Sequence, residues 1–478
     1  MNRLFQHERR ICVIAAIALA IPFFLRFPLS HAQNKNGSSG SGNEKDRVVV
    51  VISLDGFPAY ALKDPRLPIP TLRRLASEGA VAESMQPVNP TVTWPNHTAI
   101  VTGVDASQHR VLFNGLLERP EKDGPPKIKP WRDKDVMVHS PTIYDVAHEA
   151  GLTTAQVDWV AIYNAKTIDW KFPELPESDG EIEKKLIADG TVTAEQLKTF
   201  EDSSQAWQDE IWTDAAVRIL EDHHPNLLLF HLLTLDDINH EYGPMSNASM
   251  TAMAWLDSQV KRVVDVLERP AFAGRSTVII VSDHGFRAYR HKIHANVLLQ
   301  EKGILTTGKL HGDAWIVPEG GIGMVYVNNS ARKAELIARI RSIYSNAEGI
   351  EKIYGVEDFG SLGLPTPAES DQAPDLVLAG KPDYAFSGDS AKSYITDANG
   401  GTHGFLNSDP QMQAIFMAWG AGVPKHAQLG PITNREVAPT IAKLLGLEMK
   451  SAKSPALPNF GNLNAKVTSL NHPALGTT

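Results

Sequence analysis

Val48-Val49-Val50-Val51-Ile52-Ser53-Leu54-Asp55-Gly56 is the stretch that decides the fold of this chain. It begins with an unbroken run of β-branched residues, which suits a strand covered on both faces, as in a parallel sheet. The same apolar signature recurs at residues 227–233, 276–281 and 414–419. The sequence therefore predicts a buried, mainly parallel sheet whose first strand ends in a carboxylate and a glycine.

Helical patterns lie between these strands. Ser140 and Pro141 indicate the N-cap and first residue of one helix, and Gly151 indicates its end. Residues 249–268 form a long amphipathic pattern, and a capping box precedes another helical pattern at 437–447. Strands that alternate with helices predict an α/β fold with helices on both faces of the sheet.

Between His284 and His403 this alternation is lost. A helical pattern at residues 331–344 and short strand patterns near 324–327 and 351–354 stand in its place. We expect them to form a smaller α+β insertion over the main sheet, at about residues 295–395.

The N-terminus has the pattern of a targeting segment. Three arginines precede an apolar stretch at residues 11–25, and Ser30-His31-Ala32 offers small residues for cleavage. An uncleaved membrane anchor is the alternative, but this stretch is shorter than the roughly 20 residues that a spanning helix needs. We therefore expect export to the periplasm or secretion, with no stable membrane span after processing. The predicted parts of the chain are a signal peptide at 1–32, a flexible Gly- and Ser-rich linker at 33–46, a main domain at 47–449 and a tail at 450–478.

Composition excludes several classes of site. Cys12 is the only cysteine and lies in the leader, so the mature chain has no disulfide, zinc–thiolate site or cysteine nucleophile. The formal charge is −9, and it becomes −12 when residues 1–32 are removed. An acidic chain argues against the sequestration of nucleic acid, because that binding depends on phosphate neutralisation by Lys and Arg. Nucleotides remain possible as small substrates.

Polar residues with metal-binding chemistry follow the predicted strands. Asp55 ends the first strand, where ligands of open α/β sheets bind, although an isolated Asp at this place is more often a turn residue. Asp236 and His240 follow the strand at 227–233, and Asp283 with His284 ends the strand at 276–281. Asp and His are ligands of Zn²⁺ and related dications.

Two further motifs complete the candidate site. His403 lies between glycines in Gly401-Thr402-His403-Gly404, which allow close backbone approach. Any one of these histidines alone is more often structural, but two carboxylate–histidine pairs and a glycine-flanked histidine together make coincidence improbable. The histidines at 223, 224, 231, 291 and 294 are left out of the predicted metal site, because they lie at a helix end, within a strand or in a polar loop.

Thr93 is the candidate nucleophile. Pro95 starts a helical run that Gly103 ends, so Thr93 lies at a helix N-terminus, where free N–H groups favour an anion. A threonine hydroxyl becomes nucleophilic when a metal lowers its pKa. Thr93 or Thr91 could equally be a helix cap. Asn114 could donate its amide to a phosphoryl oxygen, or occupy a turn.

Taken together, these motifs resemble the type I phosphodiesterase / nucleotide pyrophosphatase family of the alkaline phosphatase superfamily. The resemblance covers roughly residues 47–447. It rests on the following motifs in this order: Ser53-Leu54-Asp55-Gly56, Thr93-Trp94-Pro95-Asn96-His97, Asp236 with His240 and Gly243-Pro244, Ser282-Asp283-His284-Gly285, and Gly401-Thr402-His403-Gly404.

The resemblance implies an alkaline-phosphatase-like α/β fold and a site with two Zn²⁺ ions, with other divalent metals as alternatives. One ion would be held by Asp236, His240 and His403, and the other by Asp55, Thr93, Asp283 and His284. Thr93 would attack phosphorus, and the phospho-threonine intermediate would then be hydrolysed. Asn114 would steady a phosphoryl oxygen. Two departures are visible, since Asn239 stands where the family usually has Gly and Trp94 where Phe is commoner.

The expected substrate is a small phosphodiester or nucleotide pyrophosphate. A phosphomonoesterase or phosphonate hydrolase with the same metal site is the alternative. A monoester dianion favours an added cation such as a bidentate Arg, and the nearest basic residue to Thr93 in the sequence is Arg110. A sulfatase, a metal-dependent mutase and an exported binding protein fit these motifs less well. The aromatic residues Trp131, Trp159, Tyr163 and Trp170 either form a wall of the substrate site or pack in the core.

Overall fold

The computed structural model describes residues 46–119, 124–306 and 311–462. The predicted signal peptide at 1–32, all of the predicted linker except Asp46, and the end of the predicted tail lie outside these residues. Among the residues described, no helix is both long and apolar enough to cross a membrane.

An eight-stranded sheet forms the centre of the main domain, with the order β20-β2-β19-β9-β1-β8-β6-β7. The strands β9, β1, β8, β6 and β7 are parallel, as the β-branched runs predict. The bounds of the strands, in the order of the sheet, are Ala427–Leu429, Ala80–Ala82, Phe416–Gly420, Ser276–Val281, Val48–Leu54, Leu227–Leu232, Thr154–Val157 and Trp170–Phe172.

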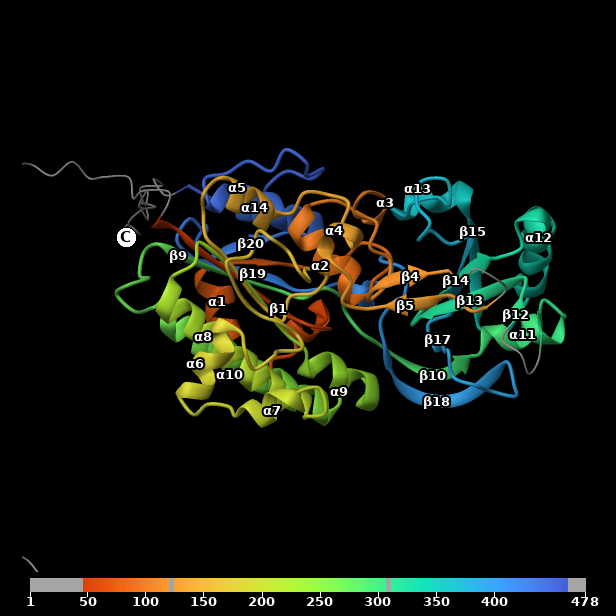
Figure 1. The fold of residues 1–478 in the computed structure, drawn as a ribbon, viewed down its shortest axis with the longest axis horizontal. Coiled ribbons are helices and arrows are strands. Elements are labelled where there is room, and N and C mark those ends of the chain that lie inside the picture. Colours follow the sequence, from red (N-terminus) through yellow and green to blue (C-terminus); the bar gives the residue numbers. More distant parts are fainter. Residues whose placement is uncertain (1–45, 120–123, 307–310, 463–478) are drawn as a thin grey trace, which may run out of the picture. The chain divides into compact units, whose positions relative to one another are not determined.

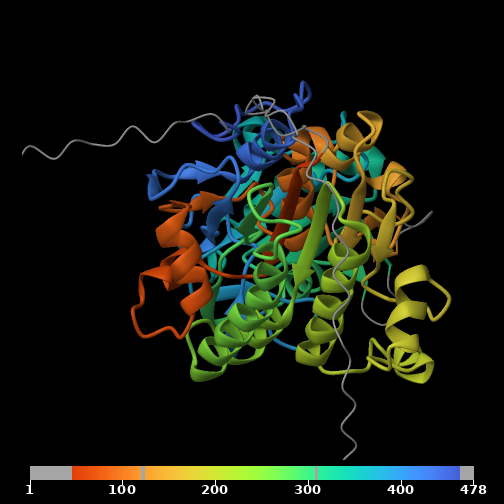
Figure 2. The same cartoon turned by 90° about the vertical axis from the view of Figure 1, so that its left-hand side faces the viewer.

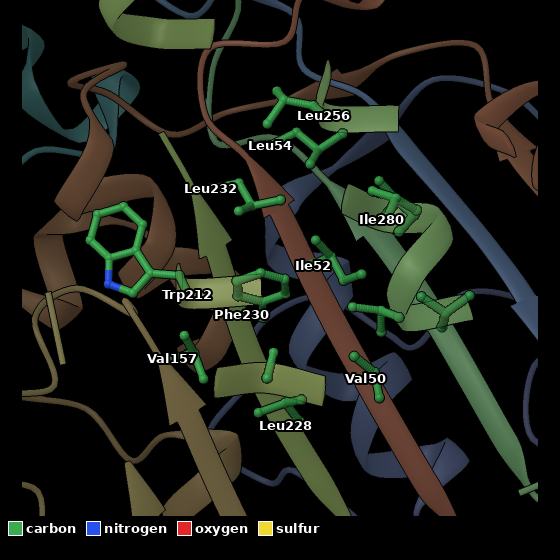
Figure 3. Packing of buried hydrophobic residues seen from close by; sticks show 14 of the residues in the cluster. Val50, Ile52, Leu54, Val157, Trp212, Leu228, Phe230, Leu232, Leu256 and Ile280 are labelled. Carbon is green, nitrogen blue, oxygen red and sulfur yellow. The ribbon is translucent and has the colours of Figure 1, made fainter. Parts of the chain in front are cut away.

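Both faces of this sheet are buried, which explains the continuous apolar run of β1. Side chains along a strand alternate between the two faces. Val50 and Ile52 therefore pack in one core cluster and Val49 and Val51 in the other. Figure 3 shows Val50 and Ile52 packed beside residues of the neighbouring strands.

Helices cover the two faces (Figure 1). The first cluster packs against α1 (Pro70–Glu78), α6 (Glu181–Ala188), α7 (Ala194–Lys198), α8 (Gln205–His223) and α10 (Asn247–Leu267). Figure 2 shows the long helices α8 and α10 side by side along the sheet. The second cluster packs against α2 (Thr93–Thr102), α5 (Ile143–Glu149) and α14 (Val437–Leu444). This is the predicted α/β architecture.

A smaller region lies between β9 and β19 in the sequence. It contains a four-stranded antiparallel sheet of order β13-β14-β16-β15 and the helix α12 (Lys333–Tyr344), which share their own apolar cluster. The strands β10 (Arg287–Ile293) and β18 (Ile395–Thr402) pair antiparallel where this region begins and ends, and β17 (Tyr384–Phe386) joins them. The four-stranded sheet consists of Ala314–Glu319, Ile322–Val327, Leu376–Gly380 and Ile350–Gly355.

The remaining elements are short. Helices α3 (Ala106–His109), α4 (Lys134–Met137), α9 (Thr234–Tyr242), α11 (Ala295–Glu301) and α13 (Phe359–Leu362) connect the larger ones. The described residues also form three two-stranded pairs: β3 (Met85–Gln86) with β21 (Ile432–Thr433), β4 (Leu116–Glu118) with β5 (Lys127–Lys129), and β11 (Leu305–Thr306) with β12 (His311–Gly312).

Two details differ from the sequence prediction. The strand predicted at 414–419 is β19, which runs antiparallel to β9 and not parallel. The helix predicted to begin at Ser140 and Pro141 is α5, which begins at Ile143 because Thr142 forms a capping box with Asp145. A side chain that bonds the N3 amide fixes a helix start more strongly than a preceding Ser-Pro pair.

Candidate active site

The carboxyl ends of β1, β8 and β9 meet at one edge of the sheet. Leu54 is in register with Leu232 of β8, and Ser53 is in register with Val281 of β9. The residues that follow these three strands therefore start from the same place, which is where parallel α/β sheets bind ligands.

Asp55 and Asp283 lie next to each other at this edge, and both are fully buried. Asp283 Oδ1 accepts hydrogen bonds from the backbone N–H of Gly56 at 3.1 Å and of His284 at 2.9 Å. Asp283 Oδ2 lies 3.1 Å from His284 Nε2, and Asp55 Oδ1 lies 3.5 Å from the same nitrogen. The structure thus brings three of the predicted residues, Asp55, Asp283 and His284, to one point.

Asp236 and His240 lie on one side of α9, four residues apart, with His240 Nε2 3.3 Å from Asp236 Oδ2. The helix has no side-chain cap of its own. Instead, the buried carboxylate of Asp209 in α8 accepts hydrogen bonds from the backbone N–H of Leu233 at 3.0 Å and of Thr234 at 3.1 Å. Asp209 therefore fixes the start of the helix that carries Asp236.

His403 follows β18, and its ring stacks on that of His284 with 3.9 Å between centroids and 19° between planes. Its Nε2 lies 3.9 Å from Asp236 Oδ1. The glycines around it are required by close approach, because a Cβ on Gly401 would lie 2.2 Å from the carbonyl oxygen of Asn239. The glycine-rich motif has the role that the sequence predicts.

The three histidines share one orientation. In each ring Nδ1 lies within hydrogen-bond distance of a backbone carbonyl: His240 with Gly401 at 3.1 Å, His284 with Gly285 at 3.2 Å and His403 with Thr91 at 3.1 Å. A proton on Nδ1 leaves the Nε2 lone pair free, and this is how metal-binding histidines are usually oriented. In all three residues Nε2 faces the carboxylates.

Thr93 is the first residue of α2 and is 7% exposed. The N-cap is Val92, which has no side-chain cap, so neither Thr93 nor Thr91 caps the helix. His97 connects Thr93 to the carboxylates, since its Nδ1 donates to the Thr93 carbonyl at 2.9 Å and lies 3.7 Å from Asp283 Oδ2.

Asn114 lies beside the start of the same helix. Its Oδ1 accepts a hydrogen bond from the backbone N–H of Trp94 at 3.0 Å. This contact places the side chain of Asn114 next to the residue that follows Thr93, and it leaves the Nδ2 donors for another partner.

Asn239, which stands where the resembled family usually has glycine, has a buried side chain that bonds within the site. Its Nδ2 donates to the carbonyl oxygen of Gly56 at 3.3 Å. The substitution therefore adds a contact between α9 and the turn that follows Asp55.

Several buried polar atoms of this site have no hydrogen-bond partner in the protein. Asp55 Oδ1, Asp236 Oδ1, Asp283 Oδ2 and His284 Nε2 are buried and have no hydrogen-bond partner. In the part of the chain that the structure describes, the ion pairs of these three carboxylates are all with histidines. Buried carboxylates without partners are costly. The residues present therefore fit divalent cations.

The ligand atoms form two groups, in each of which every atom lies within 4.8 Å of the others. One group is Asp236, His284 and His403, and the other is Asp55, Asp283 and His284. His284 lies between the two groups, and His240 joins the first through Asp236.

The pKa values reflect the crowding of charge. Burial, followed by repulsion from Asp236, raises the pKa of Asp55 to about 7. Burial and the neighbouring Asp55 raise the pKa of Asp283 well above its ordinary value. Burial lowers the pKa of His403 to about 4 and that of His284 well below its ordinary value, so both rings are neutral at pH 7. Neutral imidazoles are the form that binds metals.

His231 was left out of the predicted site, but it contacts it. The residue lies within β8, and its Nε2 is 2.9 Å from Asp55 Oδ2. Its position in an otherwise apolar strand was the available signal, because a buried imidazole needs partners. The partner on its other side, Asp158, is distant in the sequence and carried no signal.

A cavity of about 580 Å³ is lined by Trp94, the residue after Thr93. The four aromatic residues singled out in the sequence, Trp131, Trp159, Tyr163 and Trp170, all line it. Trp131 and Tyr163 are 38% and 46% exposed, so they are wall residues and not core residues. Glu174, whose Oε2 accepts a hydrogen bond from Trp131 Nε1 at 2.8 Å, and Arg132 add polar groups.

The tip of the insertion reaches the site as well. The N–H of Gly321, between β13 and β14, donates to the carbonyl oxygen of His403 at 2.9 Å. Gly320 has a φ of +64°, and a Cβ there would lie 2.1 Å from the same oxygen. The insertion therefore packs directly on the loop of His403.

Comparisons with known proteins agree with these motifs. The family described as type I phosphodiesterase / nucleotide pyrophosphatase matches residues 49–406. A pyrophosphatase/phosphodiesterase of Schizosaccharomyces pombe, described as uncharacterized, is 25% identical over 458 residues, which are 94% of this chain and 86% of the relative. The mouse ectonucleotide pyrophosphatase/phosphodiesterase family member 7 is 23% identical over 89% of this chain and 87% of its own length.

Solved structures show the same fold. Human ectonucleotide pyrophosphatase / phosphodiesterase 5 superposes with a TM-score of 0.64 at 17% identity, over 86% of this chain and 96% of the other. An inactive variant of the murine protein in complex with AMP has the same TM-score at 15% identity, over 86% of this chain and 97% of the other. With the family match over most of the main domain, the chain belongs to the type I phosphodiesterase / nucleotide pyrophosphatase family.

Proposed function

We propose that this protein is a two-metal phosphodiesterase or nucleotide pyrophosphatase in which Thr93 is the nucleophile. The observation that carries this proposal is the set of unpartnered buried carboxylate and imidazole atoms around the N-terminus of α2. Asp236, His240 and His403 would hold one ion, and Asp55, Thr93, Asp283 and His284 the other. Zn²⁺ suits this mixture of Asp and His, and other divalent metals are alternatives.

The metals, when bound, neutralise the carboxylates and stabilise the attacking and leaving oxygens of an in-line displacement. Thr93 Oγ1 loses its proton to water and forms a bond to phosphorus, while the bond from phosphorus to the leaving oxygen breaks and that oxygen takes up a proton from water. Water then hydrolyses the phospho-threonine, so that the products are a phosphomonoester and an alcohol, or two phosphate esters when the substrate is a pyrophosphate.

Protein groups around Thr93 support this assignment. The free N–H groups at the start of α2 favour a negatively charged phosphoryl group. Asn114 has its Oδ1 bonded to Trp94 N–H, so its Nδ2 is available to a phosphoryl oxygen. The cavity beside Trp94 would hold the organic substituent of the substrate, with aromatic faces on which a base could stack.

Paired assays test the proposal. The metal-loaded protein is assayed with bis-p-nitrophenyl phosphate and p-nitrophenyl phosphate, with a chelator-treated control. A monoester dianion favours an added cation such as an arginine. Within the described residues, the site carboxylates form ion pairs with histidines and with no arginine. We therefore expect faster, chelator-sensitive cleavage of the diester. Faster cleavage of the monoester would instead indicate a phosphatase.

Thr93→Ala and Thr93→Ser test the nucleophile. We expect Thr93→Ala to lose turnover by at least about 10³-fold while it still binds metal, because the hydroxyl is required for covalent catalysis. Thr93→Ser keeps a hydroxyl and should keep part of the activity. Unchanged turnover in Thr93→Ala would exclude this nucleophile.

We also propose that the protein is exported to the periplasm or secreted. The support is the sequence pattern of residues 1–32, which lie outside the described residues. The mass of the protein purified from the cell exterior tests this proposal, since cleavage after Ala32 would remove Cys12 and leave a chain without thiols.

A further inference from the structure

His231 has no assigned role, but its surroundings are unusual. The strand β8 has the sequence Leu-Leu-Leu-Phe-His-Leu, and all six residues are buried. His231 is the one ionisable residue in it, with a side chain that is 2% exposed. A polar ring at such a place destabilises the fold unless its nitrogens are bonded.

Both ring nitrogens face oxygen atoms. Nε2 lies 2.9 Å from Asp55 Oδ2. Nδ1 lies 3.1 Å from the backbone carbonyl oxygen of Asp158 and 3.0 Å from its Oδ2. The ring also contacts that of His97 edge-on, with 4.5 Å between centroids. His231 is therefore held at both ends and on one face.

The orientation of His231 is opposite to that of the candidate ligands. His240, His284 and His403 point Nε2 into the site, whereas His231 stands behind Asp55 and donates to it. With Oδ2 bonded to His231, Asp55 keeps one oxygen, Oδ1, without a protein partner and 3.5 Å from His284 Nε2.

We propose that His231 is a positioning residue that holds Asp55 Oδ2, so that Oδ1 alone is presented to a divalent metal, and that Asp158 fixes the ring of His231 in turn. The proposal rests on the metal site proposed above. It concerns the second ion, to which Asp55, Asp283 and His284 contribute. Partners that orient a ligand in this way typically change metal affinity by about 10- to 100-fold.

Three substitutions at one position separate this role from a merely structural one. In His231→Gln the amide nitrogen lies near the place of Nε2 and can still donate to Asp55. In His231→Asn it lies near the place of Nδ1 and reaches only Asp158. His231→Phe keeps the ring and removes both donors. His294→Phe is the matched control, because His294 is also buried and bonded at both nitrogens, to the Asp389 carbonyl and to Thr396, within the insertion.

The first readout is the zinc affinity of each variant, measured by competition with a fluorescent chelator. We expect His231→Phe and His231→Asn to weaken the binding of one equivalent of zinc by about 10- to 100-fold and to leave the other nearly unchanged. His231→Gln should recover most of the loss. His294→Phe should lower the melting temperature of the metal-free protein without changing either affinity. If His231→Phe does not fold, the comparison of the Gln and Asn variants remains sufficient.

The second readout is kcat and KM for bis-p-nitrophenyl phosphate at saturating zinc, where we expect His231→Asn to lower kcat more than it raises KM. Equal zinc affinities in the Gln, Asn and wild-type proteins would overturn the inference while the proposed function stands. A wild-type protein that binds no zinc and cleaves no diester would overturn the proposed function itself.

Discussion

Asp55, Asp236 and Asp283 are buried together and, among the described residues, form ion pairs only with histidines, and this crowding determines how the site responds to protons. Burial raises the pKa of Asp55 to about 7, and Asp283 is shifted in the same direction. Although burial opposes it, Asp236 raises the pKa of His240. A metal must therefore displace protons near neutral pH.

The sign of the pH effect follows from these shifts. A carboxyl whose pKa is raised in the folded state binds more protons folded than unfolded, so the metal-free protein loses stability as pH rises through about 7. His403, with a pKa of about 4, contributes in the opposite sense, but only below about pH 6.5. Between pH 6.5 and 8.5 only the carboxyl effect remains of these two, and it lowers the stability of the metal-free protein as pH rises.

We therefore predict that the melting temperature of the metal-free protein falls between pH 6.5 and 8.5, and that the rise on adding zinc is larger at pH 8.5. Differential scanning fluorimetry with and without chelator measures both. Calorimetry in buffers of different ionisation enthalpy should show proton release on zinc binding at pH 7. A metal-free melting temperature that increases over this range would contradict the assignment of the shifts.

A second prediction concerns Asn114. Asn114→Asp keeps the oxygen that accepts from Trp94 N–H and removes the amide donor. We expect kcat for a diester to fall by about 10²-fold or more, because one donor to a developing negative charge is worth that much. Metal affinity should not change. Asn114→Ala should lose a similar factor, and wild-type kcat in Asn114→Asp would show that the amide has no catalytic part.

Much of the candidate site was predictable residue by residue. Asp55, Asp236 and Asp283 follow strands whose β-branched or leucine-rich runs are visible in the sequence, and parallel strands end at one edge. The sequence offered one signal for His231, its place in an apolar strand, but not its role, because its partners Asp55 and Asp158 lie 176 and 73 residues away. Hydrogen bonds between such distant residues leave no local pattern.

At the scale of elements, α9 and α1 have no side-chain cap of their own and are capped from another helix. In α9 the N–H groups of Leu233 and Thr234 are bonded by Asp209, and in α1 those of Thr71 and Leu72 are bonded by Asp257 of α10. Each carboxylate is buried and satisfies two donors that the helix leaves free. Helix starts fixed from another helix escape local capping rules, so these two caps leave no local sequence pattern.

These two caps make a matched pair of variants. Asp209→Ala and Asp257→Ala should each destabilise the protein by about 2–4 kcal/mol, because two buried N–H groups lose their partner. Asp209→Ala should in addition weaken zinc binding, since α9 carries Asp236 and His240. Asp257→Ala should not, because α1 carries no candidate ligand. Denaturation with chelator present and zinc titration distinguish the two effects, and equal zinc affinities would show that α9 is held in other ways.

At the scale of the whole molecule, the alternation of strands and helices was sufficient to predict the class of fold. It was not sufficient for the order of the strands or the direction of β19, because pairing between distant strands depends on contacts that no local pattern encodes. The predicted tail begins at residue 450, and part of it packs on the main domain, since Leu457 and Phe460 are buried in the second core cluster.

Phe460 accordingly gives a test of how far the folded domain extends. Its ring is fully buried and lies 6.2 Å from that of Phe416 in β19. Phe460→Ala should destabilise the protein by about 3–5 kcal/mol, the usual loss for a buried phenylalanine. Denaturant unfolding measures it. A change below about 1 kcal/mol would mean that residues beyond 450 add little to the fold.

The pairing of β10 with β18 has a consequence for how such a protein can diversify. Arg287 lies opposite Thr402, and the strands stay paired as far as Ile293 and Ile395. Everything between them leaves and returns through adjacent strands, so the whole region occupies the topological position of a hairpin loop. The length and content of this region can therefore change without separating the residues that precede β10 from those that follow β18. Its contacts with the main domain must be retained or replaced: Gly321 is bonded to His403 and Gln372 to Leu117. Phe113 of the main domain also packs in one apolar cluster with Met324 and Tyr326. Exchange of the region between β10 and β18 can thus give new substrate preferences while His284 and His403, on either side of it, are kept.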